Sequence, residues 1–338
     1  MRTLFCVTLA GVLLAAGFAA EARAEDKAVI KVGIIGLDTS HVPAFTKLLN
    51  NPEATGDLAG FRVVAGFPGG SDDVKSSYSR VKGFTKDLQD MGVEIVPSID
   101  ALLPKVDVVL LESVDGRPHL AQVRPVLKAK KRVFIDKPVG GTLADVIEIY
   151  RLAKELNVPC FSASSLRFSP DIQKICHDKK IGDIMGCDAR GPCHLEPHHP
   201  DLFWYGIHGV ETLFTIMGPG CDSVTRVHTD TTEVAVGVWK DGRVGTYRGM
   251  HDSGAGHQYG AHVWGSKDIV ESGDADPYDP LVVEIAKFFK TGVVPVSPEE
   301  TIEIYAFMEA ADESKRQGGC PVKIETVMAK ARAASGSK

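Results

Sequence analysis

The first residues that could do chemistry lie where a predicted strand turns directly into a helix. Residues 32–41 read Val-Gly-Ile-Ile-Gly-Leu-Asp-Thr-Ser-His, and a dinucleotide-binding fold places its G-x-G-x-x-G fingerprint at such a turn. Gly36 takes the first glycine position, whereas Asp38 and His41 take the second and the third. The turn therefore resembles a phosphate loop that has kept one of its three glycines.

The helix that begins at this turn offers an anion-binding end. From Thr39 and Ser40 onward its first N–H groups are unpaired, and the positive end of the helix dipole could help them to hold a phosphate. Asp38 leaves two interpretations open, because its carboxylate would repel a pyrophosphate but could equally cap the helix. We therefore predict a divergent loop in which Gly36, Asp38, Thr39, Ser40 and His41 contact a phosphate-bearing cofactor.

A second departure follows the predicted strand at residues 62–65. A dinucleotide fold ends this strand with an acid that binds the ribose hydroxyls, but Pro68 stands at that position. Asp72 could reach the ribose from a longer loop, or Gly70 and Ser71 could receive a 2′-phosphate. Neither pattern is specific, so the preferred nucleotide stays open.

A histidine-rich segment could contact a metal or a substrate. Residues 194–201 read His-Leu-Glu-Pro-His-His-Pro-Asp, and these residue types include all the common ligands of divalent metals. Two prolines and an irregular spacing argue against a preformed centre. We therefore assign His194 to substrate binding and predict no metal site, and a metal-dependent enzyme built on this segment stays as an alternative.

The elements that must position these residues alternate between strand and helix in the first half of the chain. Short β-branched runs and amphipathic stretches succeed one another over residues 29–35, 41–49, 62–65, 93–96, 106–111, 120–129 and 132–135. The runs near 106–111 and 132–135 are apolar on both faces, as in a parallel sheet covered by helices. A helix at 142–156, capped by Thr142, and a last strand at 158–161 complete a Rossmann-like doubly wound domain over residues 28–162.

The second half changes character. Strand-like segments occur at residues 184–189, 223–229, 233–239, 243–250 and 262–264, and helical stretches at 280–289, 298–316 and 324–333. The Asp241-Gly242 pair between two strands is a hairpin signal. We predict a C-terminal α+β domain over residues 163–335 with an open, mainly antiparallel sheet, and its closing helices could pack against either domain.

Composition restricts the partners. The chain of 338 residues has 44% hydrophobic and 24% charged residues and a net charge of −6, which is typical of a globular protein with two domains. The negative charge argues against nucleic acid or an anionic membrane as a partner. A small-molecule partner is therefore expected.

The N-terminus predicts export. Arg2 precedes an apolar run at residues 4–20, and Ala-Arg-Ala at 22–24 fits a signal-peptide cleavage site. Residues 1–24 are thus interpreted as a signal peptide, with an uncleaved membrane anchor as the alternative, and the mature protein is expected in the periplasm or outside the cell. Six cysteines follow the leader, so disulfides could form there, although buried thiols such as Cys187 and Cys193 are as compatible with the spacing.

Four further motifs carry a family resemblance. Arg-Val-Phe-Ile-Asp-Lys-Pro at residues 132–138 resembles the EKP motif of the Gfo/Idh/MocA oxidoreductase family. Upstream, Ser113-Val114 replaces Thr-Pro in a TPxxxH-type turn that ends at His119. Downstream, residues 165–170 resemble the crossover into the second domain, and Tyr-Gly-Ile-His at 205–208 resembles the end of a DxGxH motif. In order and spacing the resemblance covers nearly the whole mature chain.

The resemblance implies a function for several residues. Members of this family bind NAD or NADP on the first domain and present a sugar or cyclitol from the second. Lys137 would take the role of the EKP lysine, hydrogen-bonding the reacting oxygen as hydride moves, and His208 that of the acid–base histidine. Ser113, Asp136 and Lys137 are also expected at the cofactor. The ordinary alternatives are a solvated lysine and a histidine satisfied in the core.

One family residue is missing. The DxGxH aspartate aligns with Trp204, and the nearest substitutes are Tyr205, which we assign to the catalytic group, and Asp201. Trp204 would suit the apolar face of a sugar ring, although such a ring often packs in a helix. Arg167 could bind substrate or could join the two domains through an ion pair.

These observations together predict an exported NAD(P)-dependent oxidoreductase-family enzyme that acts on a sugar or cyclitol-like substrate. Because free nucleotide is scarce outside the cytoplasm, we expect a retained cofactor, as in the family's NAD-dependent glycoside hydrolase branch. A dehydrogenase with an exchangeable cofactor, a lyase, and a non-catalytic binding protein on a degenerate Rossmann fold remain alternatives. The family resemblance also implies a homo-oligomer.

Overall fold

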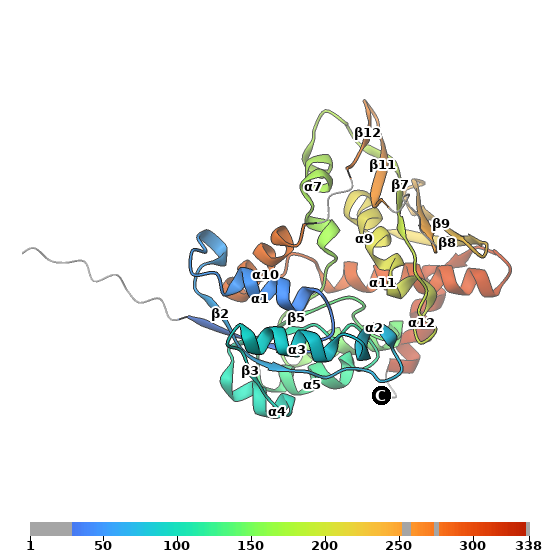
Figure 1. Ribbon diagram of the computed structural model, residues 1–338. Helices are drawn as coiled ribbons and strands as arrows, with labels where there is room; N and C mark the ends of the chain where they lie inside the picture. Colours follow the sequence, from blue (N-terminus) through green and yellow to red (C-terminus); the bar gives the residue numbers. More distant parts are fainter. Residues whose placement is uncertain (1–28, 252–257, 274–276, 336–338) are drawn as a thin grey trace, which may run out of the picture.

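The computed structural model describes residues 29–251, 258–273 and 277–335 as two α/β units (Figure 1). The predicted leader and its cleavage site lie outside these residues. None of the helices in the described ranges has the length and apolar character that a membrane crossing requires.

The first unit is built on a six-stranded parallel sheet. Its strands are β1 (Ile30–Ile35), β2 (Phe61–Phe67), β3 (Glu94–Ile95), β4 (Val108–Leu111), β5 (Arg132–Ile135) and β6 (Cys160–Phe161). The spatial order is β3-β2-β1-β4-β5-β6, which is the order of a dinucleotide-binding fold with its topological switch point between β1 and β4. Ligands of such folds bind outside the carboxyl ends of the strands at that point.

Helices cover both faces of this sheet. They are α1 (His41–Leu49), α2 (Lys75–Tyr78), α3 (Val81–Asp90), α4 (Ile99–Leu102), α5 (His119–Lys128) and α6 (Leu143–Glu155), with 3₁₀ turns η1 (Gly56–Leu58) and η2 (Leu103–Lys105). Along β4, Val108 and Leu110 join the cluster that includes Phe45 of α1, whereas Val109 and Leu111 join the cluster under α5 and α6. This two-sided burial explains the continuous apolar runs in the sequence. Thr142 caps α6, as predicted, by accepting a hydrogen bond from the backbone N–H of Asp145.

The second unit contains a seven-stranded mixed sheet. Its strands are β7 (Ile184–Pro192), β8 (Cys221–His228), β9 (Thr232–Trp239), β10 (Val244–Met250), β11 (Gly260–Gly265), β12 (Ile269–Glu271) and β13 (Val322–Lys323). The order is β12-β11-β7-β10-β9-β8-β13, with one parallel pair, β7 and β10. One face packs on α9 (Gly206–Met217) and α11 (Pro298–Arg316), while the other exposes side chains such as Val227 and Val244. The predicted fold class is therefore confirmed.

The connection between the sheets and the closing helices join the two units. The crossover carries η3 (Ser165–Phe168), α7 (Pro170–His177) and, after β7, α8 (Asp201–Trp204). Tyr205 separates α8 from α9. In Figure 1, α10 (Asp279–Thr291) lies beside α1. It packs on the first sheet through Phe288, which contacts Phe161, and Phe289, which contacts Phe61.

The last two helices contact both units. α11 packs on β8 and α9 of the second unit and on α6 of the first, and α12 (Ile324–Ser335) packs on α6 and β8. The hydroxyl of Tyr305 on α11 accepts a hydrogen bond of 2.7 Å from the backbone N–H of Val139. One buried apolar cluster therefore runs from the first sheet into the second. The sequence left open which domain the closing helices pack against, and α11 and α12 pack against both.

The six cysteines of the described residues are free thiols. Cys187 and Cys193 are both buried, and neither forms the local bridge that the sequence allowed. Burial raises the pKa of the Cys160 and Cys193 thiols to about 12, so these groups stay protonated and unreactive at neutral pH.

Gly36 is required by a close approach of two loops. Its φ is +84°, and a Cβ at this position would lie 2.3 Å from the backbone nitrogen of Ser113. Gly60 has the same φ of +84° but open space around it. We expect Gly60→Ala to destabilise the fold by about 1 kcal/mol, from the left-handed backbone alone, and Gly36→Ala by at least about 3 kcal/mol.

Urea unfolding of the two variants tests this expectation. Equal losses of unfolding free energy in Gly36→Ala and Gly60→Ala would mean that the contact between the two loops imposes no constraint.

Candidate functional site

A cleft of about 330 Å³ lies between the two units at the carboxyl ends of the first sheet. Eight of the predicted site residues line it: Thr39, Ser40, His41, Lys137, His194, Trp204, Tyr205 and His208. They come from α1, from the loop after β5 and from the segment that includes α8 and α9. The fold thus brings together residues that are up to 169 positions apart in the chain.

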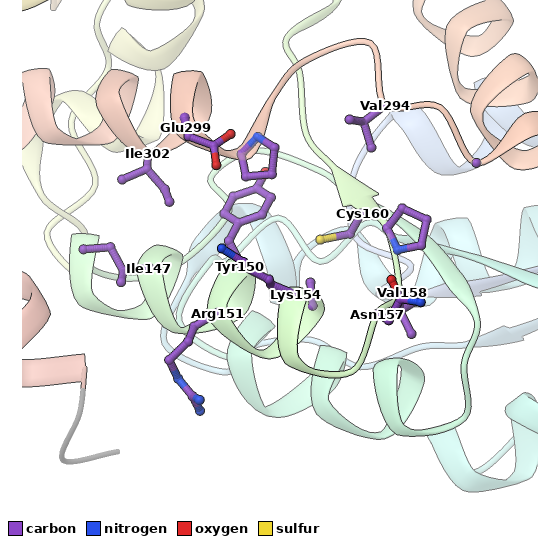
Figure 2. A pocket seen from close by; sticks show the side chains of 14 residues that line it. Ile147, Tyr150, Arg151, Lys154, Asn157, Val158, Cys160, Val294, Glu299 and Ile302 are labelled. Carbon is purple, nitrogen blue, oxygen red and sulfur yellow. The ribbon is translucent and has the colours of Figure 1, made fainter.

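A larger cavity of about 640 Å³ lies elsewhere. Figure 2 shows its lining side chains, among them Ile147 and Tyr150 on α6, Cys160 on β6 and Ile302 on the first turns of α11. It contains none of the predicted site residues, and its lining is mainly apolar. We place the candidate site in the smaller cleft, because the chemistry-bearing residues converge there.

Lys137 projects into the cleft directly after β5. Its ammonium lies 5.4 Å from the centroid of the Tyr205 ring, a cation–π distance that positions the charge against an aromatic wall. The His194 ring contacts the same tyrosine edge-on at 4.9 Å. Tyr205 therefore organises two polar side chains of the opposite walls.

His208 faces Lys137 from the second unit. It is buried on α9, and its Nδ1 lies 2.7 Å from the hydroxyl oxygen of Ser164. Burial, with a contribution from the Lys137 charge, holds the pKa of His208 well below its usual range. The imidazole is therefore neutral at physiological pH and able to accept a proton.

Ser164, in the crossover between the sheets, holds the imidazole of His208. Its hydroxyl contacts His208, and its backbone N–H donates to the Glu211 carboxylate at 2.8 Å. Sequence reasoning missed both residues. The spacing of three between His208 and Glu211 places them on one helix face, but Ser164 reaches them from the other unit, and no local pattern announces that contact.

The two substitutes proposed for that aspartate occupy different places. Asp201 forms ion pairs with Arg226 at 2.8 Å and Lys315 at 2.7 Å and does not line the cleft. Tyr205 does line it. Trp204 borders the cleft as well, with its ring 4.8 Å from that of His199.

Arg167 lies beneath the cleft rather than on its wall. Its guanidinium is buried and pairs with Glu211 and Glu300, each at 2.7 Å. These two pairs join the crossover to α9 and α11, which both pack on the second sheet. The predicted contact of Arg167 with substrate finds no support in this geometry, since both pairs hold the guanidinium away from the cleft-lining residues.

Asp38 does not cap α1, which corrects that interpretation. The cap position is Ser40 without a side-chain hydrogen bond, whereas the buried Asp38 carboxylate accepts hydrogen bonds from Ser77 at 2.6 Å and from the backbone N–H of Val114 at 2.9 Å. Burial raises the pKa of Asp38. The carboxylate thus joins three loops and faces the protein, so its repulsion of a bound phosphate is reduced.

The wall of the cleft nearest α1 fits a pyrophosphate. Thr39 and Ser40 stand at the amino end of the helix, Arg80 adds a cation, and the Ser76 hydroxyl is buried without a hydrogen-bond partner. None of the described residues that line the cleft is an aspartate or a glutamate. Serine and arginine are ordinary phosphate ligands. Sequence reasoning missed both, because Ser76 lies on the short helix α2 and Arg80 in the turn between α2 and α3, where no sequence motif marks them.

The adenosine end differs from the usual arrangement. The loop after β2 is fastened to the loop after β4, since Ser71 donates to Asp115 at 2.6 Å and Arg117 pairs with Asp73 at 2.6 Å. Asp72 is exposed on this loop. No carboxylate follows β2 directly, so any ribose contact has to come from the loop itself.

Ser113 and Asp136 are buried behind the cleft. Ser113 donates to Gln122 at 2.9 Å, and its carbonyl oxygen lies 2.8 Å from Nε2 of His119. Asp136 accepts from the backbone N–H of Lys137 and lies 2.8 Å from Nδ1 of His41. Burial alone would lower the pKa of His41, but the neighbouring carboxylates of Asp136 and Glu112 together outweigh it and raise that pKa to about 9. The Asp136 carboxylate thereby fixes both neighbours.

The histidine-rich segment docks on the first unit. His199 lies 3.0 Å from Asp115, and His198 lies 2.6 Å from Glu196 and 3.6 Å from Asp73. In the described ranges, the one group of three metal-ligating side chains that converges lies outside this segment. The segment therefore joins the second unit to the loops after β2 and β4 through His198 and His199.

Comparison with known proteins matches the first unit of the chain to a family. Residues 30–164 match the model of the Gfo/Idh/MocA proteins, described as an oxidoreductase family with an NAD-binding Rossmann fold. A 2,7-anhydro-N-acetylneuraminate hydratase of Escherichia coli (strain K12) is 29% identical over 101 residues. That match spans 28% of this chain and 26% of the hydratase, so the chain covers about a quarter of the relative's length.

Solved structures share the fold of both units. A probable dehydrogenase from Thermotoga maritima has a TM-score of 0.70 at 22% identity over 88% of this chain and 100% of its own. The scyllo-inositol dehydrogenase from Lactobacillus casei, solved with NAD(H) and scyllo-inositol, has a TM-score of 0.72 at 15% identity over 88% of this chain and 99% of its own.

The charge on Lys137 should be visible in the titration of His208. We expect the pKa of native His208 to lie well below that of a free imidazole and to rise in Lys137→Met, because removal of a nearby cation favours the imidazolium. Histidine-selective ¹⁵N NMR measures the pKa, with the His208→Gln spectrum for assignment and the exposed Lys240→Met as the control. A native pKa near 6.5, or equal shifts in the two lysine variants, would contradict the assigned geometry.

Proposed function

We propose that this chain is a member of the Gfo/Idh/MocA oxidoreductase family, whose model matches residues 30–164, and that it oxidises a hydroxyl group of a sugar or cyclitol-like substrate in the cleft, or reduces the matching ketone. The observation that carries the proposal is the pairing of Lys137 and a neutral His208 across one cleft. A cation and a general base facing each other suit the removal of a proton from a hydroxyl as its carbon loses hydride.

The nucleotide is the group that this chain's residues are suited to hold. NAD, when bound, supplies the acceptor or donor of hydride. Thr39, Ser40, Ser76 and Arg80 would bind its pyrophosphate, and the unpartnered Ser76 hydroxyl supports that assignment. We extend the proposal to NAD or NADP, since the fastened β2 loop favours neither.

His208 and Lys137 have different roles in the proposed proton transfer. Because Nδ1 of His208 is held by Ser164, Nε2 is the atom that takes the proton of the substrate hydroxyl. The Lys137 ammonium donates to the same oxygen and stabilises its developing negative charge. The rings of Trp204 and Tyr205 border the cleft and suit the C–H face of a cyclic polyol.

We also propose that the protein works outside the cytoplasm with a cofactor that stays bound. The signal-like residues 1–24 support export. A retained nucleotide has to be regenerated within each turnover, for example by oxidation, elimination or addition of water, and re-reduction of the same substrate. The short match to a curated hydratase favours this second type of net reaction.

The first experiment identifies the nucleotide. The mature protein is purified without added cofactor and denatured, and any released NAD or NADP is identified by mass spectrometry. One equivalent per chain supports a retained cofactor. If none is released and the protein binds neither nucleotide at millimolar concentration, the oxidoreductase proposal fails and a non-catalytic binding protein replaces it.

Arg80 and Ser76 should determine nucleotide affinity. We expect Arg80→Ala to weaken NAD binding about 10-fold or more, because a charged hydrogen bond to phosphate contributes about 1.5–3 kcal/mol, and Ser76→Ala to weaken it less. Isothermal titration of emptied protein measures both, with the exposed Arg62→Ala on β2 as the matched control. Unchanged affinity in Arg80→Ala would remove the pyrophosphate from this wall.

Lys137 should be needed for turnover and dispensable for folding. We expect Lys137→Ala to lower kcat by about 10²–10³-fold, the effect of removing one donor to a developing oxyanion. Reduction of the bound nucleotide is followed at its absorbance maximum with a panel of inositols and pyranosides, beside Lys240→Ala as the control. Equal turnover in the two variants would deny Lys137 a chemical role.

A further inference from the structure

Three side chains converge beneath the cleft although they are distant in sequence. His41 begins α1, Glu112 directly follows β4 and Asp136 directly follows β5, so all three stand at the carboxyl edge of neighbouring strands. Each offers one potential ligand atom, and these atoms lie within 4.8 Å of one another. All three side chains are buried, with exposed fractions of 6%, 0% and 1% respectively.

The environment of Glu112 is unusual. Neither of its carboxylate oxygens has a hydrogen-bond partner, although the side chain is fully buried. Nδ1 of His41 lies 3.6 Å from Glu112 and 2.8 Å from Asp136, yet it lacks an acceptable hydrogen-bond geometry to either. A buried carboxylate without partners is costly unless a charged group compensates it. Three lone-pair donors are thus directed at one small region.

One cation bound among the three atoms would account for this arrangement. The Nδ1–H group of His41 can donate one good hydrogen bond, and Asp136 is the nearer acceptor. Protonation of the imidazole therefore leaves the Glu112 carboxylate without a hydrogen-bond donor. A metal ion can contact a nitrogen and two carboxylate oxygens at once. From this geometry we propose that His41, Glu112 and Asp136 form a binding site for a divalent transition-metal ion.

The donor set indicates which ions are suitable. One imidazole and two carboxylates match Zn²⁺, Mn²⁺ and Fe²⁺, whereas Mg²⁺ and Ca²⁺ prefer oxygen ligands alone. The sequence analysis predicted no metal, and the alternative that it considered lay in residues 194–201. The proposed ligands escaped it because they lie 71 and 24 residues apart in the chain.

Surrounding residues hold the proposed metal ligands in place, as in established metal sites. The His41 ring stacks on Phe45 with centroids 5.0 Å apart and meets the Tyr278 ring edge-on at 4.8 Å. The second oxygen of Asp136 accepts the backbone N–H of Lys137 at 2.8 Å. His41 also lines the cleft, which gives an ion a path to the site.

The site is independent of the proposed redox function, although the two are adjacent. Its ligands include Asp136, whose neighbour Lys137 projects into the cleft. A divalent ion here would add positive charge below the amino end of α1, where an anionic ligand is expected. Metal binding can therefore be tested on the emptied protein without any substrate.

The experiment is a metal titration of the full mature protein. After chelation, Zn²⁺ and Mn²⁺ are titrated by isothermal calorimetry, and stoichiometry is measured by elemental analysis. We expect one equivalent per chain and a higher melting temperature, with affinity lowered at least 100-fold in the isosteric Glu112→Gln. Because Cys176 and Cys320 are exposed thiols that can bind Zn²⁺, all proteins carry Cys176→Ser and Cys320→Ser.

A second variant and a spectrum separate this site from others. Glu196→Gln with His198→Gln removes ligands from the histidine-rich segment and should leave the affinity unchanged. If Glu112→Gln does not fold, the visible spectrum of Co²⁺ bound to the Glu112-containing protein decides, since it distinguishes nitrogen and oxygen ligands from thiolate. Binding that survives Glu112→Gln, that disappears with the histidine-segment variant, that shows thiolate bands, or that is absent at millimolar metal overturns the proposal.

Discussion

The buried guanidinium of Arg167 is the interaction on which the cleft depends. It lies in the crossover between the two sheets and pairs with Glu211 on α9 and Glu300 on α11. Glu211 in turn accepts the backbone N–H of Ser164, whose hydroxyl contacts His208. One charge therefore fixes the crossover, α9 and α11 relative to one another, and the orientation of His208 toward the first unit follows from it.

Burying these three charges costs desolvation free energy, and in return their pairing fixes the relative orientation of the elements that carry them. An ion triad that is almost fully buried contributes little net stability compared with apolar packing, but loss of one partner leaves an uncompensated charge. The apolar cluster that runs through α6, α11 and α9 supplies the stability. The ion pairs of Arg167 fix the orientation of His208, since apolar packing alone would tolerate small rotations of the second unit that move His208 away from Lys137.

The sequence predicted what depends on local periodicity and missed what depends on contacts between units. Apolar runs buried on both faces gave the parallel sheet, and the strand-to-helix turn at Gly36 located one wall of the cleft. The partner of His208 was not predictable, because Ser164 is an ordinary serine until the second unit folds onto it. Glu112 likewise directly follows a strand, as many acids do, and only the approach of His41 distinguishes it.

The same distinction explains how a degenerate fingerprint can remain compatible with an anion. A glycine at position 38 would leave space for a phosphate, whereas Asp38 uses its carboxylate to fasten the loops after β1, β2 and β4. The carboxylates of Asp38, Glu112 and Asp136 all lie behind the cleft, and the residues that line it include Arg80 and Lys137 but no acid among those described. Negative charge is thus held in the floor and positive charge at the surface. Because the field at a bound anion is dominated by the nearest groups, the lining determines what binds, and the acids below it determine how rigidly that lining is held.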